Sequence, residues 1–127
     1  MTFLLDNDIP PRIAQAVAVL DGDVKALREV FPEDAEDVSW LEQLGLKGWV
    51  LVTADRRILT RPQEVVILKQ ARVTSFFLGP FFGSLQFWDQ AVWFVKHWPR
   101  FEQMAQTIGQ GTCFVVKANG KMNAISV

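Results

Sequence analysis

Acidic side chains follow two short apolar runs of the sequence, and a third acidic group lies between these runs. The acidic residues are Asp6 and Asp8 after the first run, with the amide Asn7 between them, Asp34, Glu36 and Asp37 in the interval, and Asp55 after the second run. Carboxylates held close together repel one another, and a divalent cation removes that repulsion. Oxygen donors without histidine or paired cysteine favour Mg²⁺ or Mn²⁺ over Zn²⁺. Such ions activate water and stabilise the oxyanions of a phosphodiester during hydrolysis, so the acidic residues indicate this chemistry.

The elements that must position these residues alternate along the chain between strand and helix. Apolar runs and turn signals predict strands at 3–5, 24–31, 49–53 and 72–78, and helices at 10–20, 37–44, 61–71 and 84–108. The segment 24–31 fits a helix nearly as well as a strand. Gly45 is expected to end the second helix, and Pro99 to interrupt or kink the last one. The dipeptide Asn119-Gly120 predicts a hairpin near the C-terminus.

This alternation is typical of a single α/β domain, here residues 1–127, in which helices cover both faces of a mainly parallel sheet. Ligands of such sheets bind beyond the carboxyl ends of the strands. Asp6 and Asp55 follow two of these strand ends, and Asp37 begins a helix that starts at the same edge. We therefore expect the three carboxylates to converge at one edge of a three-layer α/β/α fold.

Each acidic residue also has an ordinary structural explanation, because acidic side chains often serve turns and helix caps or pair with a neighbouring arginine. These roles would apply to Asp6 and Asp8 in a turn, to Asp34 or Asp37 as a helix cap, and to Asp55 beside Arg56, Arg57 or Arg61. The predicted convergence of all three groups on one edge favours a functional site over three unrelated structural roles.

The overall composition is that of an ordinary globular protein without an electrostatic preference for nucleic acid. Of the 127 residues, 50% are hydrophobic and 21% are charged, and the formal net charge is −1. Any binding of RNA or DNA therefore needs a local basic surface or metal ions. The N-terminus lacks a basic region followed by a long apolar stretch, and no window has the roughly 20 apolar residues of a membrane helix. We expect a cytoplasmic protein without a membrane segment.

Other reactive residue types form no competing catalytic set. Cys113 is the single cysteine and His97 the single histidine, and we expect both to pack rather than to react. Neither a GxxxxGK[ST] phosphate-binding loop nor a GxGxxG sequence occurs. The phenylalanines and tryptophans of segment 76–98 are expected to form core and a dimer surface rather than to stack nucleotide bases, because their spacing is helical and few basic residues lie among them.

Two longer segments carry a family resemblance. The sequence FLLDNDIPPRIAQAV, residues 3–17, combines a strand that ends in an acidic residue with a proline-led helix. The sequence DVSWLEQLGLKGWVLVTADRRIL, residues 37–59, has a helix beginning with Asp and a strand that closes on Thr-x-Asp. Together they cover roughly the first half of the chain, and they resemble short bacterial PIN-like domains, including VapC-type toxin ribonucleases.

The resemblance implies a Mg²⁺- or Mn²⁺-dependent ribonuclease, and it assigns roles by position. Those roles are metal ligand and catalytic residue for Asp6, Asp37 and Asp55, further metal ligand for Asp8, support for Thr53 and Asn7, and contact with RNA phosphates for Arg12 and Arg56. The resemblance further implies an RNA substrate, an antitoxin protein as partner, and self-association into a homodimer.

The sequence departs from the family pattern in one respect. PIN nucleases commonly add an acidic residue from a helix between the first strand and the later Asp pair, and here Glu29 and Glu33 are the candidates for that position. A catalytically silent PIN-like interaction module is therefore the alternative. A receiver-like or phosphatase-like fold is disfavoured, because the strand at 72–78 is not followed by the lysine that phosphoacceptor chemistry needs.

Overall fold

The computed structural model describes residues 1–127, except for the side chain of Asp21. In chain order the elements are β1 (Phe3–Leu5), α1 (Pro11–Asp21), β2 (Val24–Ala26), α2 (Leu27–Val30), α3 (Asp37–Lys47), β3 (Val50–Thr53), the short 3₁₀ helix η1 (Arg56–Thr60), α4 (Pro62–Gln70), β4 (Ser75–Leu78), α5 (Phe81–Ser84), α6 (Phe87–Thr107), β5 (Cys113–Val116) and β6 (Met122–Ile125). Strands and helices thus alternate over most of the chain, as predicted.

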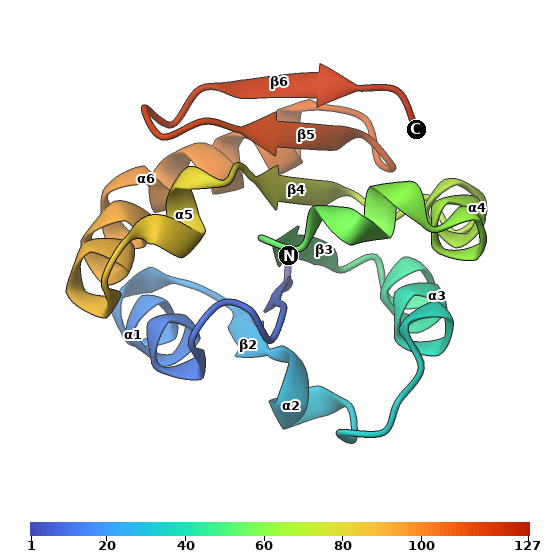
Figure 1. Ribbon diagram of the computed structural model, residues 1–127, viewed down its shortest axis with the longest axis horizontal. Coiled ribbons are helices and arrows are strands. Elements are labelled where there is room, and N and C mark those ends of the chain that lie inside the picture. Colours follow the sequence, from blue (N-terminus) through green and yellow to red (C-terminus); the bar gives the residue numbers. More distant parts are fainter.

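The strands form one six-stranded sheet in the order β2-β1-β3-β4-β5-β6 (Figure 1). The first five strands in this order are parallel to their neighbours, and β6 alone runs antiparallel, beside β5. The register aligns the carboxyl ends of the two central strands, because Leu5 pairs with Val52. Residues that follow β1 and β3 therefore emerge side by side at one edge of the sheet.

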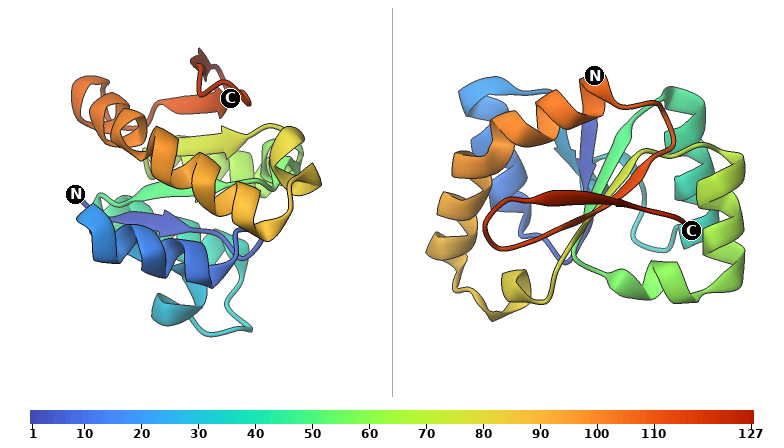
Figure 2. Two further views of the ribbon diagram at one scale, coloured as in Figure 1. Left: turned by 90° about the vertical axis from the view of Figure 1, so that its left-hand side faces the viewer. Right: turned by 90° about the horizontal axis from the view of Figure 1, so that it is seen from above.

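Helices cover both faces of the sheet. Helices α1, α5 and α6 lie on one face, and α3 and α4 lie on the other, which can be followed in Figure 1 and from above in Figure 2. This confirms the predicted three-layer α/β/α fold with a mainly parallel sheet and a C-terminal hairpin. In the hairpin, Gly120 adopts a positive φ of 86°, a conformation that favours glycine.

Each layer boundary has its own apolar core, because neighbouring residues of a strand point to opposite faces. Leu5 and Val52 belong to the core beneath α1 and α6, whereas Leu4 and Leu51 belong to the core beneath α3 and α4. Most aromatic side chains of segment 76–98 join these cores, as predicted, and Trp88 is the exposed exception at 74%. Since Leu5 and Val52 face α1 and α6, the next residues, Asp6 and Thr53, are directed toward the other layer.

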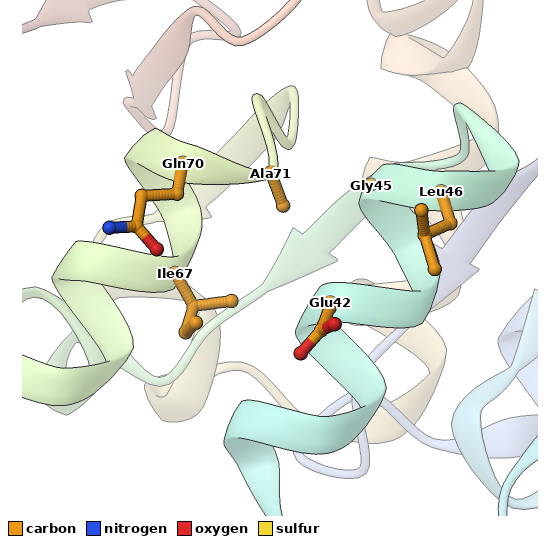
Figure 3. Close-up of a pocket in the computed structure, with 6 residues that line it drawn as sticks. All are labelled: Glu42, Gly45, Leu46, Ile67, Gln70 and Ala71. Atoms are coloured by element: carbon orange, nitrogen blue, oxygen red, sulfur yellow. The ribbon is translucent and has the colours of Figure 1, made fainter.

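Several predicted boundaries differ from the structure; the strand predicted at 72–78, for example, begins at Ser75. Segment 24–31 is a strand only over Val24–Ala26 and continues as α2, so its strand and helix readings are each correct for part of it. The prediction that Gly45 ends α3 was wrong, because the helix continues to Lys47 and is closed by Gly48 at a φ of 68°. Gly45 and Ala71, the residue after α4, line one pocket between the two helices (Figure 3). A Cβ at position 45 would lie 2.4 Å from the Cβ of Ala71, so Gly45 allows close packing of α3 against α4.

Helix α6 continues through Pro99. Of the two effects expected of this proline, an interruption of the helix therefore does not occur. A proline inside a helix removes one backbone hydrogen bond. Burial of Trp93, Phe94, Trp98 and Phe101 along the same helix offsets that loss. Among the described residues, no helix is both long and apolar enough to cross a membrane.

Candidate functional site

The ends of β1 and β3 are joined by hydrogen bonds through Thr53. Its buried hydroxyl donates to Oδ2 of Asp6 at 2.9 Å and accepts from the backbone N–H of Asp55, also at 2.9 Å. The backbone N–H of Ala54 donates to Oδ1 of Asp8 at 3.3 Å. Parallel strand ends thus position both acidic segments, and the Thr53 side chain fixes them relative to each other.

These segments and the first turn of α3 line one pocket of about 250 Å³ at the carboxyl edge of the sheet. We call it the acid pocket, and its lining residues are Asp6, Asn7, Asp8, Asp37, Asp55, Arg57 and Arg61. The predicted convergence of the carboxylates of Asp6, Asp37 and Asp55 therefore occurs in the structure. Four carboxyl groups face two guanidinium groups here, so acidic groups outnumber cationic groups.

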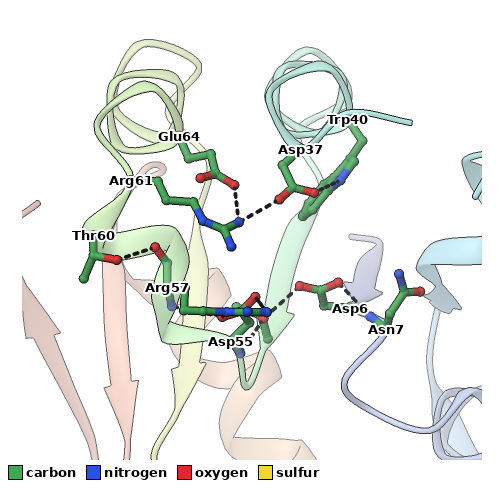
Figure 4. Close-up of polar contacts among 10 residues, drawn as sticks. Asp6, Asn7, Asp37, Trp40, Asp55, Arg57, Thr60, Arg61 and Glu64 are labelled. Atoms are coloured by element: carbon green, nitrogen blue, oxygen red, sulfur yellow. Dashed lines mark hydrogen bonds and ion pairs between the residues drawn. The ribbon is translucent and has the colours of Figure 1, made fainter. Parts of the chain in front are cut away.

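Arg57 neutralises Asp55 at one side of the acid pocket. Its guanidinium donates from Nε to Oδ1 at 2.9 Å and from Nη2 to Oδ2 at 3.0 Å, a two-point pair seen in Figure 4. The backbone N–H of Arg57 also donates to Oδ1 at 3.0 Å. These bonds hold the pKa of Asp55 below its usual range, and the bonds from the guanidinium contribute most. The ordinary explanation of Asp55 as the partner of an arginine is thus correct for Arg57.

Arg61 joins two acids at the other side of the acid pocket. Its Nη1 lies 3.3 Å from Oδ2 of Asp37 and 3.2 Å from Oε1 of Glu64, and both carboxylates point toward it in Figure 4. Trp40 donates from Nε1 to the remaining oxygen of Asp37 at 3.0 Å. Asp37 is the first residue of α3 and its side chain caps no helix. Its partners therefore come from α3 itself and from the start of α4.

Among the described side chains, Asp6 and Asp8 form no ion pair, although the charges of Asp8 and Arg57 do interact across the pocket. Burial raises the pKa of Asp6, hydrogen bonds from the Asn7 N–H and from Thr53 oppose this, and the charges of Asp37 and Asp55 raise it further. Asp8 is an exposed residue, yet partial desolvation of its carboxyl group and repulsion from Asp6 raise its pKa to about 6. Negative charge is thus least compensated at these two residues.

The donor set has the chemistry of a site for a hard divalent cation, because it consists of carboxylate oxygens with uncompensated charge. The carboxylates are not preassembled around one point: within the described part of the chain, no group of three or more histidine, cysteine, aspartate or glutamate side chains is arranged to hold a metal ion. Asp37 and Asp55 are instead held by the two arginines. The residue types fit a metal, and a shift of side chains is needed to gather them.

The other residues with predicted roles lie around the acid pocket or away from it. Asn7 lines it, with its amide oriented so that its oxygen accepts from Nη2 of Arg28 at 2.6 Å. Arg12 does not line it, because its guanidinium lies over the ring of Phe87 at 4.8 Å. Arg56 begins η1 beside the pocket without lining it. Asp34 lines a neighbouring hollow at the start of α3.

Sequence reasoning missed Glu64 as part of this arrangement. Its side chain is only 4% exposed, and burial together with the neighbouring Asp37 carboxylate raises its pKa. Its Oε2 is buried and has no hydrogen-bond partner among the described residues. The spacing of three positions between Arg61 and Glu64 at a predicted helix start was the available signal, since residues at this spacing lie on one helical face. Neither Glu29 nor Glu33 lines the acid pocket.

The remaining reactive residue types lie apart from the acid pocket. Cys113 is buried in the core beneath α3 and α4, which raises the pKa of its thiol. His97 contacts the ring of Trp93 at 4.8 Å on α6, and partial burial and its cationic neighbours lower its pKa. Both placements agree with the predicted packing roles.

Comparison with known proteins identifies the first part of the chain. The family model described as a PIN-like domain matches residues 1–80, more than half of the sequence, and this range includes every residue that lines the acid pocket. Searches of curated proteins and of solved structures returned no match. The chain therefore belongs to the PIN-like domain family.

Proposed function

We propose that this PIN-like protein is a metal-dependent RNA endonuclease that hydrolyses phosphodiester bonds. The observation that carries the proposal is the excess of carboxylates in the acid pocket, where four acids face two arginines. A pocket of this charge repels RNA unless cations are bound, and a hard divalent cation is the simplest agent that satisfies the acids and attracts a phosphate.

Asp6, Asp37 and Asp55 would hold Mg²⁺ or Mn²⁺, with Asp8 as a further ligand. The bound ion would lower the pKa of a water molecule and stabilise the oxyanion at the phosphorus. Thr53 keeps Asp6 in place by donating to Oδ2, and it keeps Asp55 in place by accepting from its backbone N–H. The positions of Asp6 and Asp55 thus both depend on one buried hydroxyl.

The RNA backbone would cross the carboxyl edge of the sheet, since the acid pocket opens there. Arg56 lies at the start of η1 beside the pocket, and its guanidinium suits two phosphate oxygens at once. Arg12 lies in the first turn of α1, near the same edge of the sheet. Its guanidinium would reach a neighbouring phosphate after leaving the Phe87 ring. Asn7 would support the pocket through its contact with Arg28.

We further propose that the protein is the toxin of a toxin–antitoxin pair in the cytoplasm, with an antitoxin protein as partner and a homodimer as its own assembly. Exposed apolar residues support a protein partner: Val19 and Leu20 on α1, and Trp88 and Val92 on α6, are at least 63% exposed. Expression of the wild type in bacteria should arrest growth, and Asp55→Asn should relieve the arrest. Equal growth of both strains would contradict the toxin role.

Cleavage of labelled RNA in the presence of Mn²⁺ tests the enzymatic proposal. We expect Asp55→Asn to lose at least about 100-fold in rate, because an amide cannot supply the negative charge of a metal ligand. Asp23→Asn is the matched control, since Asp23 precedes β2 at the opposite edge of the sheet. Cleavage by Asp55→Asn at the wild-type rate would overturn the proposal.

A catalytically silent interaction module is the second candidate. It is favoured by the arrangement of the acids among the described residues, where no three are gathered for a metal. In that case Arg57 and Arg61 would be permanent structural partners of Asp55 and Asp37. Absence of cleavage with Mg²⁺ and Mn²⁺, together with a stable complex with a partner protein, would favour this candidate.

A further inference from the structure

Arg57 differs from an ordinary structural arginine in how it is held. Its side chain is 74% exposed, and within the described part of the chain both of its guanidinium bonds go to the carboxylate of Asp55. The Asp55 side chain is 19% exposed, but solvent screens the exposed guanidinium, and an ion pair with one partner in solvent contributes little to stability. The guanidinium of Arg57 can therefore leave Asp55 at low cost.

Arg61 provides the contrast inside the same pocket. Its Nη1 contacts two carboxylates, and one of them belongs to Glu64, which is nearly fully buried. Moving Arg61 away would leave the buried Glu64 carboxylate without this partner, which is costly. Of the two arginines that line the acid pocket, Arg57 is therefore the one that can move.

Asp55 remains oriented when the guanidinium is gone. The backbone N–H of Arg57 donates to its Oδ1, and the backbone N–H of Asp55 itself donates to the hydroxyl of Thr53. Neither bond involves the side chain of residue 57. The carboxylate of Asp55 would thus face the acid pocket in the same place, with Oδ2 free.

We propose that Arg57 is a phosphate-binding residue that exchanges partners: it holds Asp55 while the pocket lacks a cation, and it binds an RNA phosphate once a divalent cation takes the carboxylate. The inference rests on the proposed nuclease function. A cation and the guanidinium compete for the same oxygens of Asp55, so both cannot hold them fully. A planar guanidinium with two parallel N–H donors matches a phosphate as well as a carboxylate, and Arg57 lines the pocket where that phosphate would lie.

The first test measures the affinity for Mn²⁺ by calorimetry without RNA. We expect Arg57→Ala to bind Mn²⁺ about two- to fivefold more tightly than the wild type, the range expected when an exposed competing ion pair is removed. Arg100→Ala, an exposed arginine on α6 outside the acid pocket, is the matched control and should bind as the wild type does.

The second test measures binding of a short 2′-O-methyl RNA oligonucleotide with Mn²⁺ present, after gel analysis shows that it stays intact. Here Arg57→Ala should bind roughly tenfold more weakly, because a charge-assisted phosphate contact is lost. Arg57→Lys should recover part of this affinity through its charge. Opposite changes in the two assays cannot result from misfolding, which would weaken both.

The outcomes separate the inference from the proposed function. Mn²⁺ binding with equal affinity in wild type and Arg57→Ala would overturn the exchange and leave the nuclease proposal in place. Weaker Mn²⁺ binding by Arg57→Ala, or unchanged oligonucleotide binding, would also overturn the exchange. Failure of both proteins to bind Mn²⁺ would overturn the proposed function and the exchange together.

Discussion

The hydroxyl of Thr53 donates a 2.9 Å hydrogen bond to Oδ2 of Asp6, and both side chains are buried. The two residues are 47 positions apart in sequence and meet because β1 and β3 are parallel neighbours in register. The bond partly compensates the burial that raises the pKa of Asp6. Thr53 thus keeps a buried acid available for chemistry at the carboxyl edge.

Replacement of Thr53 by valine should destabilise the fold and disturb the acid pocket. The change removes the donor to Asp6 and the acceptor for the Asp55 N–H, so we expect a loss of about 1–3 kcal/mol in the free energy of unfolding. Thr53→Ser keeps the hydroxyl and should lose less. Urea denaturation measures both, and Thr107→Val, at an exposed position on α6, is the control. A Thr53→Val protein as stable as the wild type would contradict this role.

Asp8 should make stability depend on pH. Its pKa is raised in the folded protein from 3.8 to about 6, so folding favours the protonated form. The associated stability is fully present below about pH 4 and is lost as the pH rises through about 6. Asp8→Asn should therefore be more stable than the wild type at pH 7.5, by no more than about 1 kcal/mol because solvent screens this exposed residue.

Thermal unfolding at several pH values checks the Asp8 prediction. The two proteins should have the same melting temperature near pH 4 and should separate as the pH rises. The Ala54 N–H can still donate to the amide oxygen of the variant, so this contact is kept. Lower stability of Asp8→Asn at pH 7.5 would show that the carboxylate is not under electrostatic strain.

Gly45 should resist substitution because of tertiary packing rather than backbone conformation. An added Cβ would lie 2.4 Å from the Cβ of Ala71 and 2.6 Å from its carbonyl oxygen, so α3 and α4 would have to separate. We expect Gly45→Ala to cost about 1–3 kcal/mol, the range of overpacked sites. Gly83→Ala is the control, since its Cβ would meet nothing within 4 Å. Equal melting temperatures of the two variants would be inconsistent with this packing.

The sequence predicted the parts of the site that depend on strand order. Asp6 and Asp55 follow the carboxyl ends of two parallel strands, and Asp37 begins a helix at the same edge. Each of these placements can be read from a short stretch of sequence, so the meeting of the three residues was predictable. The Arg61–Glu64 pair and its contact with Asp37 depend on how α3 and α4 pack, which periodicity does not specify. The same packing explains why Gly45, a typical helix terminator by composition, lies inside α3.

Arg12 shows the same limit of prediction from sequence, because its side-chain contact depends on tertiary packing. Arg12 was expected to contact phosphate, and its position near the carboxyl edge follows from the proline-led helix. Its guanidinium nevertheless lies over Phe87, a residue 75 positions away that only the folded chain brings near. Contacts of long flexible side chains depend on such neighbours, so residue type alone predicts them poorly.

The most direct test of a divalent-cation site in the acid pocket is to locate Mn²⁺ by paramagnetic broadening of backbone amide signals in NMR spectra. Substoichiometric Mn²⁺ should broaden the signals of Asn7, Ala54 and Asp55 around the acid pocket before that of Gly109, which lies near the opposite edge of the sheet beside the start of β5. Asp6→Asn should remove this selective broadening. Broadening that is absent, or that is centred elsewhere and survives in Asp6→Asn, would contradict a divalent-cation site in the acid pocket.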